Sequence, residues 1–542
     1  MIRRHVKGIS MALALLLFGA SFAGCGKKDN AGAEKKGKAG EASAQTGAVS
    51  YPIQTDVTLK YWMALATNIS GYATNFGDTE IGKELTKKTG VKIQYIHPAT
   101  GQAKETMNIL IASGDLPDII EYRWSDFPGG PVNAINSGVV LKLNDVLDKY
   151  SPNLKKYLVE NPNFDKEVKT DDGSYYCYPF IRGDKTLLNT SGPMMRKDWL
   201  DELGLPLPET LDDWYNTLKA FKEKKGVPIP LSSFGDKAGS NVMLIFENAF
   251  GIRTDFYNDN GKVKYGYIEP GYKDMLAFLA KLYKEGLLDK NVASTDRKTV
   301  DANVLNGKTA AIYGAGGGNL GSYLTVMKEK DPKFDLTAVK FPAIKKGQSP
   351  KSTASDNMVA SESQVVITTN CKNVDVAARF LDYGYSKEGN LLYNFGTEGV
   401  SYNMVNGKPT YSDLVMKNPD KLSVAQAMSK YTRANVNGPF VQDKGYLEQY
   451  YELPQQKEAV KIWSNHNKPP LLPIVTPTDE ESSESAKLMN DILTYIQEMK
   501  YKFIMGVTPI EDYDKYLDQL KKMNIDRVIQ LKQNALDRFN KR

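Results

Sequence analysis

The chain has 542 residues, 41% of them hydrophobic and 25% charged, which is ordinary for a soluble globular protein and too long for one simple core. The net charge of +6 is uneven: residues 1–50 hold eight Lys and Arg against three Asp and Glu, a balance of +5, so residues 51–542 carry only +1. A nearly neutral body argues against binding of nucleic acid through its phosphates, and the histidines His5, His97 and His466 lack metal-ligand spacing.

The first residues of the chain predict export. Arg3, Arg4 and Lys7 precede an apolar run over residues 11–18, which is too short to span a membrane comfortably. The run ends in Ala23-Gly24-Cys25, which resembles a bacterial lipobox, although Phe22 stands where Leu is usual. This pattern implies removal of a signal peptide over residues 1–24 and acylation of Cys25, for example with palmitate. An ordinary signal peptide with an incidental cysteine is the alternative.

A polar stretch over residues 25–50 has Val49 as its only sizeable apolar residue, so it predicts a disordered tether from the lipidated cysteine to the body. No other segment approaches membrane-spanning length. Cys177 and Cys371 are expected to be buried and free, although export would permit a disulfide and the sequence does not settle whether they pair.

The body begins with alternating strand and helix patterns. Strands are predicted at 57–62, 91–96 and 117–122, with helices at 78–90 and 103–114 between them. This β-α-β-α-β order predicts a parallel sheet with helices on its faces, and ligands of such sheets lie beyond the carboxyl ends of the strands.

Later helices are also well signalled. Thr210 and Asp213 predict a capping box at the start of a helix, and further amphipathic helices are expected at 272–286, 373–385, 479–504 and 509–524. We assign packing roles to these helices.

Several blocks, in order, resemble a known family. "IASGDLPDII" (111–120), "RKDWLDELGLPLPETLDDWYNTLKAFKEK" (196–224), "VLNGKTAAIYGAGG" (304–317), "FLDYGYSKEGNLLYNFGTEGVSY" (380–402) and the stretch 502–539 are similar to extracellular solute-binding lipoproteins of ABC importers, family 1, of the large oligosaccharide-binding type. The match covers nearly all of residues 51–542.

The resemblance implies an α/β, two-lobed, periplasmic-binding-protein-like fold with discontinuous lobes and hinge strands. The first lobe would comprise residues 51–183 plus 345–405, and the second, helix-rich lobe 184–344 plus 406–542. It implies a monomer without catalysis or cofactor that holds a glycan between its lobes and delivers it to importer permease subunits. The protein would be lipid-anchored at the outer face of the bacterial cytoplasmic membrane. Many relatives carry an acidic, calcium-type loop after the "LKAFKEK" helix; here Lys225-Gly226 stand there, so no metal is expected.

The sequence also contains features to set against three other functions. "GGGNLG" (316–321) satisfies GxGxxG, but an exported protein has little access to a dinucleotide, and close backbone approach is the favoured interpretation. A secreted glycosidase needs two carboxylates flanking a bond, and no acidic pair is marked as catalytic. A receptor that presents its ligand to a membrane sensor would use the same fold as an importer component.

Sugars are bound by aromatic rings and by planar polar groups. The expected rings lie near predicted strand ends: Trp62, Tyr72, Tyr122, Trp124, Tyr313 and Tyr402. The expected polar partners are Asn68, Asp126, Arg182, Asn319, Glu398 and Arg433. Within "YNFGTEGVSYN" (393–403), Gly396 and Gly399 are expected to bend the backbone. Sugar identity, linkage and length are not readable from the sequence.

Overall fold

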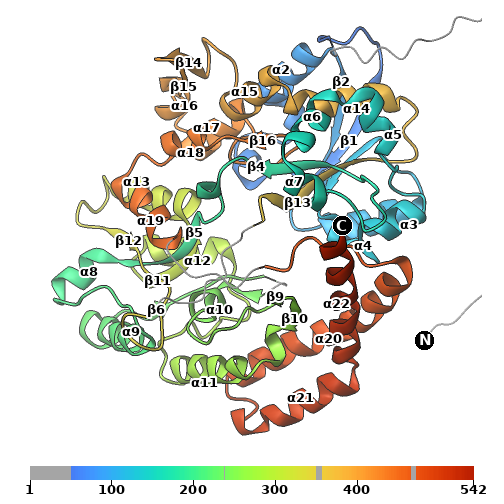
Figure 1. The fold of residues 1–542 in the computed structure, drawn as a ribbon. Helices are drawn as coiled ribbons and strands as arrows, with labels where there is room; N and C mark the ends of the chain where they lie inside the picture. Colours follow the sequence, from blue (N-terminus) through green and yellow to red (C-terminus); the bar gives the residue numbers. More distant parts are fainter. Residues whose placement is uncertain (1–49, 237–238, 349–356, 465–470) are drawn as a thin grey trace, which may run out of the picture. The chain divides into compact units, whose positions relative to one another are not determined.

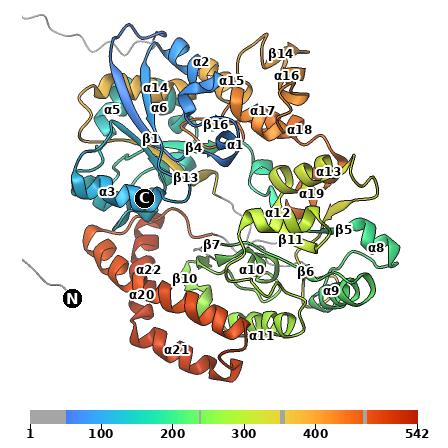
Figure 2. The ribbon, with the colours of Figure 1, turned by 180° about the vertical axis from the view of Figure 1, so that it is seen from behind.

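The computed structural model describes residues 50–236, 239–348, 357–464 and 471–542, all within the compact unit formed by residues 47–542. The predicted signal peptide, Cys25 and nearly all of the tether lie outside the described residues. Figures 1 and 2 show the fold from opposite sides. None of the helices within the described ranges combines the length and apolar character that a bilayer span requires.

Five elements near the start of the body confirm the predicted alternation. They are β1 (Thr58–Met63), α2 (Glu80–Thr89), β2 (Lys92–Ile96), α3 (Ala103–Ser113) and β3 (Ile119–Tyr122). The sequence sets the ends of α2: Thr79 accepts a hydrogen bond from the Gly82 amide, and Gly90 ends the helix in the left-handed conformation. β1 pairs in parallel with both β2 and β3, as the crossover helices require.

These strands belong to a six-stranded sheet whose order is β16-β4-β13-β3-β1-β2. The strands that complete it come from distant parts of the chain: β4 (Tyr178–Arg182), β13 (Val359–Ile367) and β16 (Val441–Gln442). β13 runs antiparallel to β3 and β4 and joins them. The sheet is therefore mixed, with the predicted parallel part at one side.

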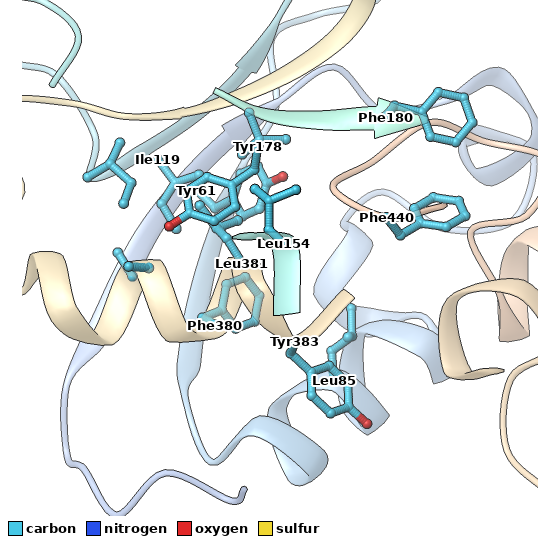
Figure 3. Close-up of a cluster of buried hydrophobic side chains, with 14 of the residues drawn as sticks. Tyr61, Leu85, Ile119, Leu154, Tyr178, Phe180, Phe380, Leu381, Tyr383 and Phe440 are labelled. Carbon is cyan, nitrogen blue, oxygen red and sulfur yellow. The ribbon is translucent and has the colours of Figure 1, made fainter. Parts of the chain in front are cut away.

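Both faces of this sheet are covered. Adjacent residues on β1 point to opposite faces, so Tyr61 enters one apolar cluster and Trp62 the other. Figure 3 shows the first cluster, where Tyr61 lies among Leu154, Phe380 and Leu381. Its helices include α2, α5 (Asn144–Tyr150), α6 (Pro152–Glu160), α14 (Val374–Asp382) and α15 (Lys387–Phe395). The opposite cluster includes residues of α3 and α4 (Gly130–Asn136).

A second, four-stranded sheet has the order β12-β5-β11-β6. Its strands are β5 (Ser191–Arg196), β6 (Ile229–Leu231), β11 (Thr309–Ala315) and β12 (Leu336–Ala338). One face packs on α9 (Leu211–Lys225), α10 (Asn241–Phe246) and α11 (Pro270–Lys284). The other packs on α12 (Arg297–Leu305), α13 (Ser322–Met327) and α19 (Pro454–Ser464). The predicted capping box of Thr210 and Asp213 is present at the start of α9.

The C-terminal helices α20 (Asp479–Ile504) and α21 (Tyr513–Lys522) form as predicted. Together with α22 (Ile525–Lys541), for which no helix was predicted, they join the α11 side of this second core. A hairpin of β9 (Phe256–Asp259) and β10 (Lys262–Tyr265) packs against α22. Arg538 of α22 forms ion pairs with Asp171 and Glu481, so α22 also contacts a turn next to the first sheet.

The stretch between α15 and α19 belongs with the first sheet. It contains β14 (Tyr402–Val405), β15 (Lys408–Tyr411), α16 (Asp413–Met416), α17 (Val424–Tyr431), β16 and α18 (Lys444–Tyr450). These elements share an apolar cluster with Phe395, and β16 pairs with β4. After this stretch the chain returns to the second core at α19. The family resemblance implied that this crossing to the second lobe follows residue 405. No sequence pattern marks a two-residue strand, which explains the difference.

The remaining elements are short. They are α1 (Thr67–Ser70), α7 (Pro162–Glu167), α8 (Lys197–Glu202), β7 (Gly235–Asp236) and β8 (Gly239–Ser240). Cys177 and Cys371 are both buried and free, as expected.

Candidate ligand-binding cleft

A cavity of about 450 Å³ is lined on one side by residues of the six-stranded sheet and on the other by residues at β9 and in α22, which pack with the second core. From the six-stranded sheet come the residue after β3, the last residue of β4 and the first residues of β13. The full lining is Arg123, Arg182, Leu188, Arg253, Asp255, Phe256, Asn357, Val359, Ala360, Ser361, Glu362, Leu471, Leu472 and Lys532. The carboxyl ends of β3 and β4 thus reach the cavity, as expected for ligand sites on such sheets.

Arg182 is held in this cleft by neutral neighbours. Its Nη1 donates a hydrogen bond of 3.2 Å to Oε1 of Gln442 on β16, and its guanidinium lies 5.4 Å from the centre of the Phe180 ring. Gln442 is buried, and its amide donates to the Ala434 carbonyl. The guanidinium is therefore positioned by an amide and a ring.

The opposite wall is built by the β9–β10 hairpin and α22. The Phe256 ring stacks on Tyr265 at 4.3 Å between centroids, and Leu471 is bridged to Tyr257 beside it. Lys532 is half-buried with its ammonium 5.8 Å from the centre of the Phe256 ring. Burial lowers the pKa of Lys532, and nearby Asp255 partly opposes that effect.

Positive charge prevails in the lining. Arg123, Arg182, Arg253 and Lys532 contribute four cations, against the two carboxylates of Asp255 and Glu362. An aromatic ring, three leucines and several planar polar groups accompany them, which is the mixture expected for a sugar site.

Of the ligand contacts predicted from the sequence, Arg182 lines this cleft. Tyr122 and Asp126 are not among the lining residues, but they lie on either side of Arg123, which is. Tyr122 is half-buried between Trp62 and Trp124, whereas Asp126 is exposed and its carboxylate is 3.9 Å from the Arg123 guanidinium. Partial desolvation of the carboxyl raises the pKa of Asp126, and the Arg123 guanidinium partly opposes this rise.

Trp62 and Trp124 are in the core. They are 1% and 0% exposed, and Nε1 of Trp124 donates to the Gln364 carbonyl at 3.1 Å. Helices α3 and α4 cover the strand ends at which these two tryptophans lie, so neither ring has a free face. Their placement favours packing over ligand contact.

Arg433 forms a buried ion pair. Its Nη2 lies 2.9 and 3.0 Å from the two carboxylate oxygens of Glu121 on β3, and Arg433 is only 2% exposed. Burial alone would lower its pKa, but the Glu121 carboxylate raises it above the ordinary value. A Cβ atom on Gly438 would lie 2.7 Å from the guanidinium carbon, which explains a glycine there. This arrangement assigns Arg433 a structural contact.

The glycine-rich segment Gly316–Gly321 forms a short π-helix that serves close packing. Asn319 is 1% exposed; its Oδ1 accepts from the Ala315 amide, and its Nδ2 donates to Tyr323. Cβ atoms added at Gly316 and Gly317 would collide with the rings of Tyr451 and Tyr450. These glycines therefore allow the C-terminal end of α18 to approach closely. The side-chain amide of Asn319 is already engaged in hydrogen bonds within the protein.

Other predicted contacts lie elsewhere. Tyr72, just after α1 and its Asn68, lines a separate cavity with Asp420 and Lys430. Tyr313 on β11 is half-buried and packs in both cores of the second sheet.

The loop after α15 lines a third cavity through Glu398 and Tyr402. Glu398 is exposed, whereas Tyr402 is only 4% exposed and packs with Phe395. Gly396 and Gly399 have φ of 86° and 77°, so they bend this loop as expected.

Sequence reasoning missed most of the cleft. Arg123 follows a predicted strand and lies between Tyr122 and Trp124, which were both expected as ligand contacts, so strand-end position could have found it. Phe256 and Lys532 come from a hairpin and a C-terminal helix; no local pattern distinguishes them from other surface residues.

Asp172, Asp213, Glu481 and His97 make structural contacts. Asp213 and Glu481 complete capping boxes at α9 and α20. Asp172 accepts hydrogen bonds from Thr170 and Ser174, and these bonds lower its pKa despite partial burial. His97 accepts from the Phe76 amide at 3.0 Å through Nε2, with Nδ1 2.8 Å from the Met63 carbonyl, and burial lowers its pKa.

The loop after α9 begins at Gly226, with φ of 68°, directly after Lys225. Within the described ranges no cluster of three or more His, Cys, Asp or Glu side chains is arranged to hold a metal ion.

The chain resembles known proteins in sequence and in fold. Residues 73–391 match the model of the family described as bacterial extracellular solute-binding protein. The chain belongs to this family. This solute-binding protein is 27% identical to the fructooligosaccharide ABC transporter substrate-binding protein FusA of Streptococcus pneumoniae, and the match covers 96% of each chain. It is 25% identical to the polygalacturonan/rhamnogalacturonan-binding protein YtcQ of Bacillus subtilis, over 96% of this chain and 97% of the other.

The fold of this solute-binding protein is also seen in solved structures. The alginate-binding protein AlgQ2 without calcium superposes with a TM-score of 0.76 at 26% identity, covering 89% of this chain and 98% of that one. FusA in complex with kestose gives 0.73 at 24% identity, covering 90% and 100%. The two-lobed α/β fold expected from the sequence is confirmed.

Proposed function

We propose that this solute-binding protein captures an oligosaccharide in the cleft and delivers it to the permease subunits of an ABC importer. The cleft carries this proposal, because it combines the Phe256 ring, apolar side chains and planar polar groups. Relatives that match almost end to end are named as binding proteins for oligosaccharides and polysaccharides. The protein would bind without turnover and act as a monomer without a cofactor.

Lobe closure is part of the proposal. The two lobes would enclose the ligand by hinge motion, with the crossing segments at the ends of β4 and β13 and between α18 and α19. Closing the cleft would exclude water and strengthen the polar contacts of Arg182 with the sugar.

Membrane attachment completes the proposed role. Acyl chains on Cys25 would hold the body at the outer face of the bacterial cytoplasmic membrane. Attachment would keep the loaded protein near its importer.

A thermal-shift screen against an oligosaccharide panel tests capture. A ligand at 100 times its Kd stabilises the folded state by about 2.7 kcal/mol, which is readily measured. Chromatography of the same mixtures separates binding from hydrolysis. Failure of every glycan to shift the transition would contradict capture, and release of shorter sugars would favour the glycosidase alternative.

A further inference from the structure

The cleft has a local charge that the rest of the body lacks. Residues 51–542 carry a net charge of only +1, yet the cavity lining has two more cations than carboxylates. This excess is therefore a property of the cleft. Charge concentrated in a concave site raises the local concentration of ligands of opposite sign and selects among partners.

Arg182 is suited to an anion. Its contacts with Gln442 and Phe180 fix the guanidinium without neutralising it. Within the described ranges, no carboxylate oxygen lies within 4.0 Å of its nitrogens. A planar guanidinium held in one orientation can donate two parallel hydrogen bonds to a carboxylate.

Lys532 faces the same space from the second wall. It is half-buried over Phe256, and no carboxylate of the described residues lies within ion-pair distance. Withdrawing an ammonium from water without a paired anion is unfavourable, and a bound anion would restore the lost interaction.

We infer that the ligand of this cleft is an acidic oligosaccharide, whose sugar units carry carboxylate groups. This inference rests on the proposed function and adds the chemical class of the sugar. Two carboxylates would balance the excess of two cations, with Arg182 and Lys532 as their partners on opposite walls. Asp255 and Glu362 remain as acceptors for sugar hydroxyl groups, and the Phe256 ring offers a face for a sugar ring.

Titration calorimetry on the purified full chain tests the inference. The acidic probes are oligogalacturonate and oligomannuronate of matched length; the neutral probes are the methyl ester of the same oligogalacturonate and a maltooligosaccharide. We expect the acid to bind at least about tenfold more tightly than its ester, with an affinity that falls as salt rises. A sulfated oligosaccharide is included, and tighter binding of sulfate than of both carboxylate probes would overturn the assignment to carboxylates.

Variants locate the effect. Arg182→Gln and Lys532→Gln should each weaken binding of the acidic probe about tenfold more than they weaken binding of the neutral probes. Lys461→Gln, which removes an equal charge from an exposed side chain on α19, should change neither. Circular dichroism and the melting temperature establish that each variant is folded.

The outcomes separate the two proposals. Neutral probes that bind as tightly as acidic ones would overturn the charge inference and leave capture of a glycan standing. Absence of binding by all probes, acidic and neutral, would count against glycan capture itself and the inference with it. Loss of acidic binding in Lys461→Gln would show that general charge, rather than the cleft, is responsible.

Discussion

Replacing Arg433 by Met tests whether this residue serves the fold or the ligand. The substitution retains much of the side chain's length but removes the guanidinium that lies 2.9 and 3.0 Å from the Glu121 carboxylate. The side chains of Arg433 and Glu121 are 3% and 9% exposed, so water does not replace the lost partner. Glu121 would keep its hydrogen bonds from the hydroxyl groups of Tyr61 and Ser363 while losing the balancing charge.

The expected cost is about 3–5 kcal/mol, the range for removing one partner of a buried ion pair. With an unfolding entropy of about 2.1 cal/mol/K per residue over a cooperative unit of about 250 residues, the melting temperature should fall by about 6–10 °C. Differential scanning calorimetry at neutral pH measures this change. Below the transition, affinity for a glycan identified in the screen should remain that of the unmodified protein.

A matched control exists on the surface. Arg527 forms a two-bond ion pair with Glu484, at 2.7 Å for each bond, but the two side chains are 48% and 41% exposed. Arg527→Met removes the same group from similar geometry, and it should barely move the transition because water and salt already screen the pair. Equal shifts for the two variants, or a loss of glycan affinity in folded Arg433→Met, would refute this reasoning.

Three further predictions concern attachment, pH and packing. Cys25→Ser should move the protein from the membrane to the soluble fraction; continued membrane association would argue against lipidation. Burial raises the pKa of Glu167 to about 7, so the folded state loses stability as pH rises from about 4.5 toward 7, by up to about 3 kcal/mol. In Glu167→Gln the difference between melting temperatures at pH 5 and pH 8 should shrink, and an unchanged difference would exclude this carboxyl as the source. Gly192→Ala should cost about 1–3 kcal/mol in chemical denaturation, because its Cβ would lie 2.4 Å from the buried Trp463 ring; a negligible change would show that the ring moves freely.

Local signals in the sequence were sufficient for most helices and for the first sheet. Thr210 and Asp213 specify the start of α9 through groups three residues apart, and Gly90 specifies the end of α2. Alternation along β1 places Tyr61 and Trp62 on opposite faces. Such features depend on neighbours along the chain, so they can be recognised without knowing the rest of the fold.

Strand-end position was a weaker guide to the ligand site. It selected Arg182, which lines the cleft, but it also selected Trp124 and Arg433, whose exposure is only 0% and 2%. Whether a ring or a charge near a strand end reaches solvent depends on what packs over it. For Trp124 this is the α3–α4 layer, and for Arg433 it is the Glu121 carboxylate from a strand more than three hundred residues earlier.

The sequence by itself determined the α/β alternation, the export pattern, the family and the near-neutral charge of the body. Only the tertiary structure decided that Arg182 and Lys532 line one cavity, because a strand end and a C-terminal helix 350 residues apart meet there. The total charge of the chain is additive and can be counted from the residues. The excess of positive charge in the cleft depends on which residues the fold brings together, and that excess is the basis for expecting an acidic sugar.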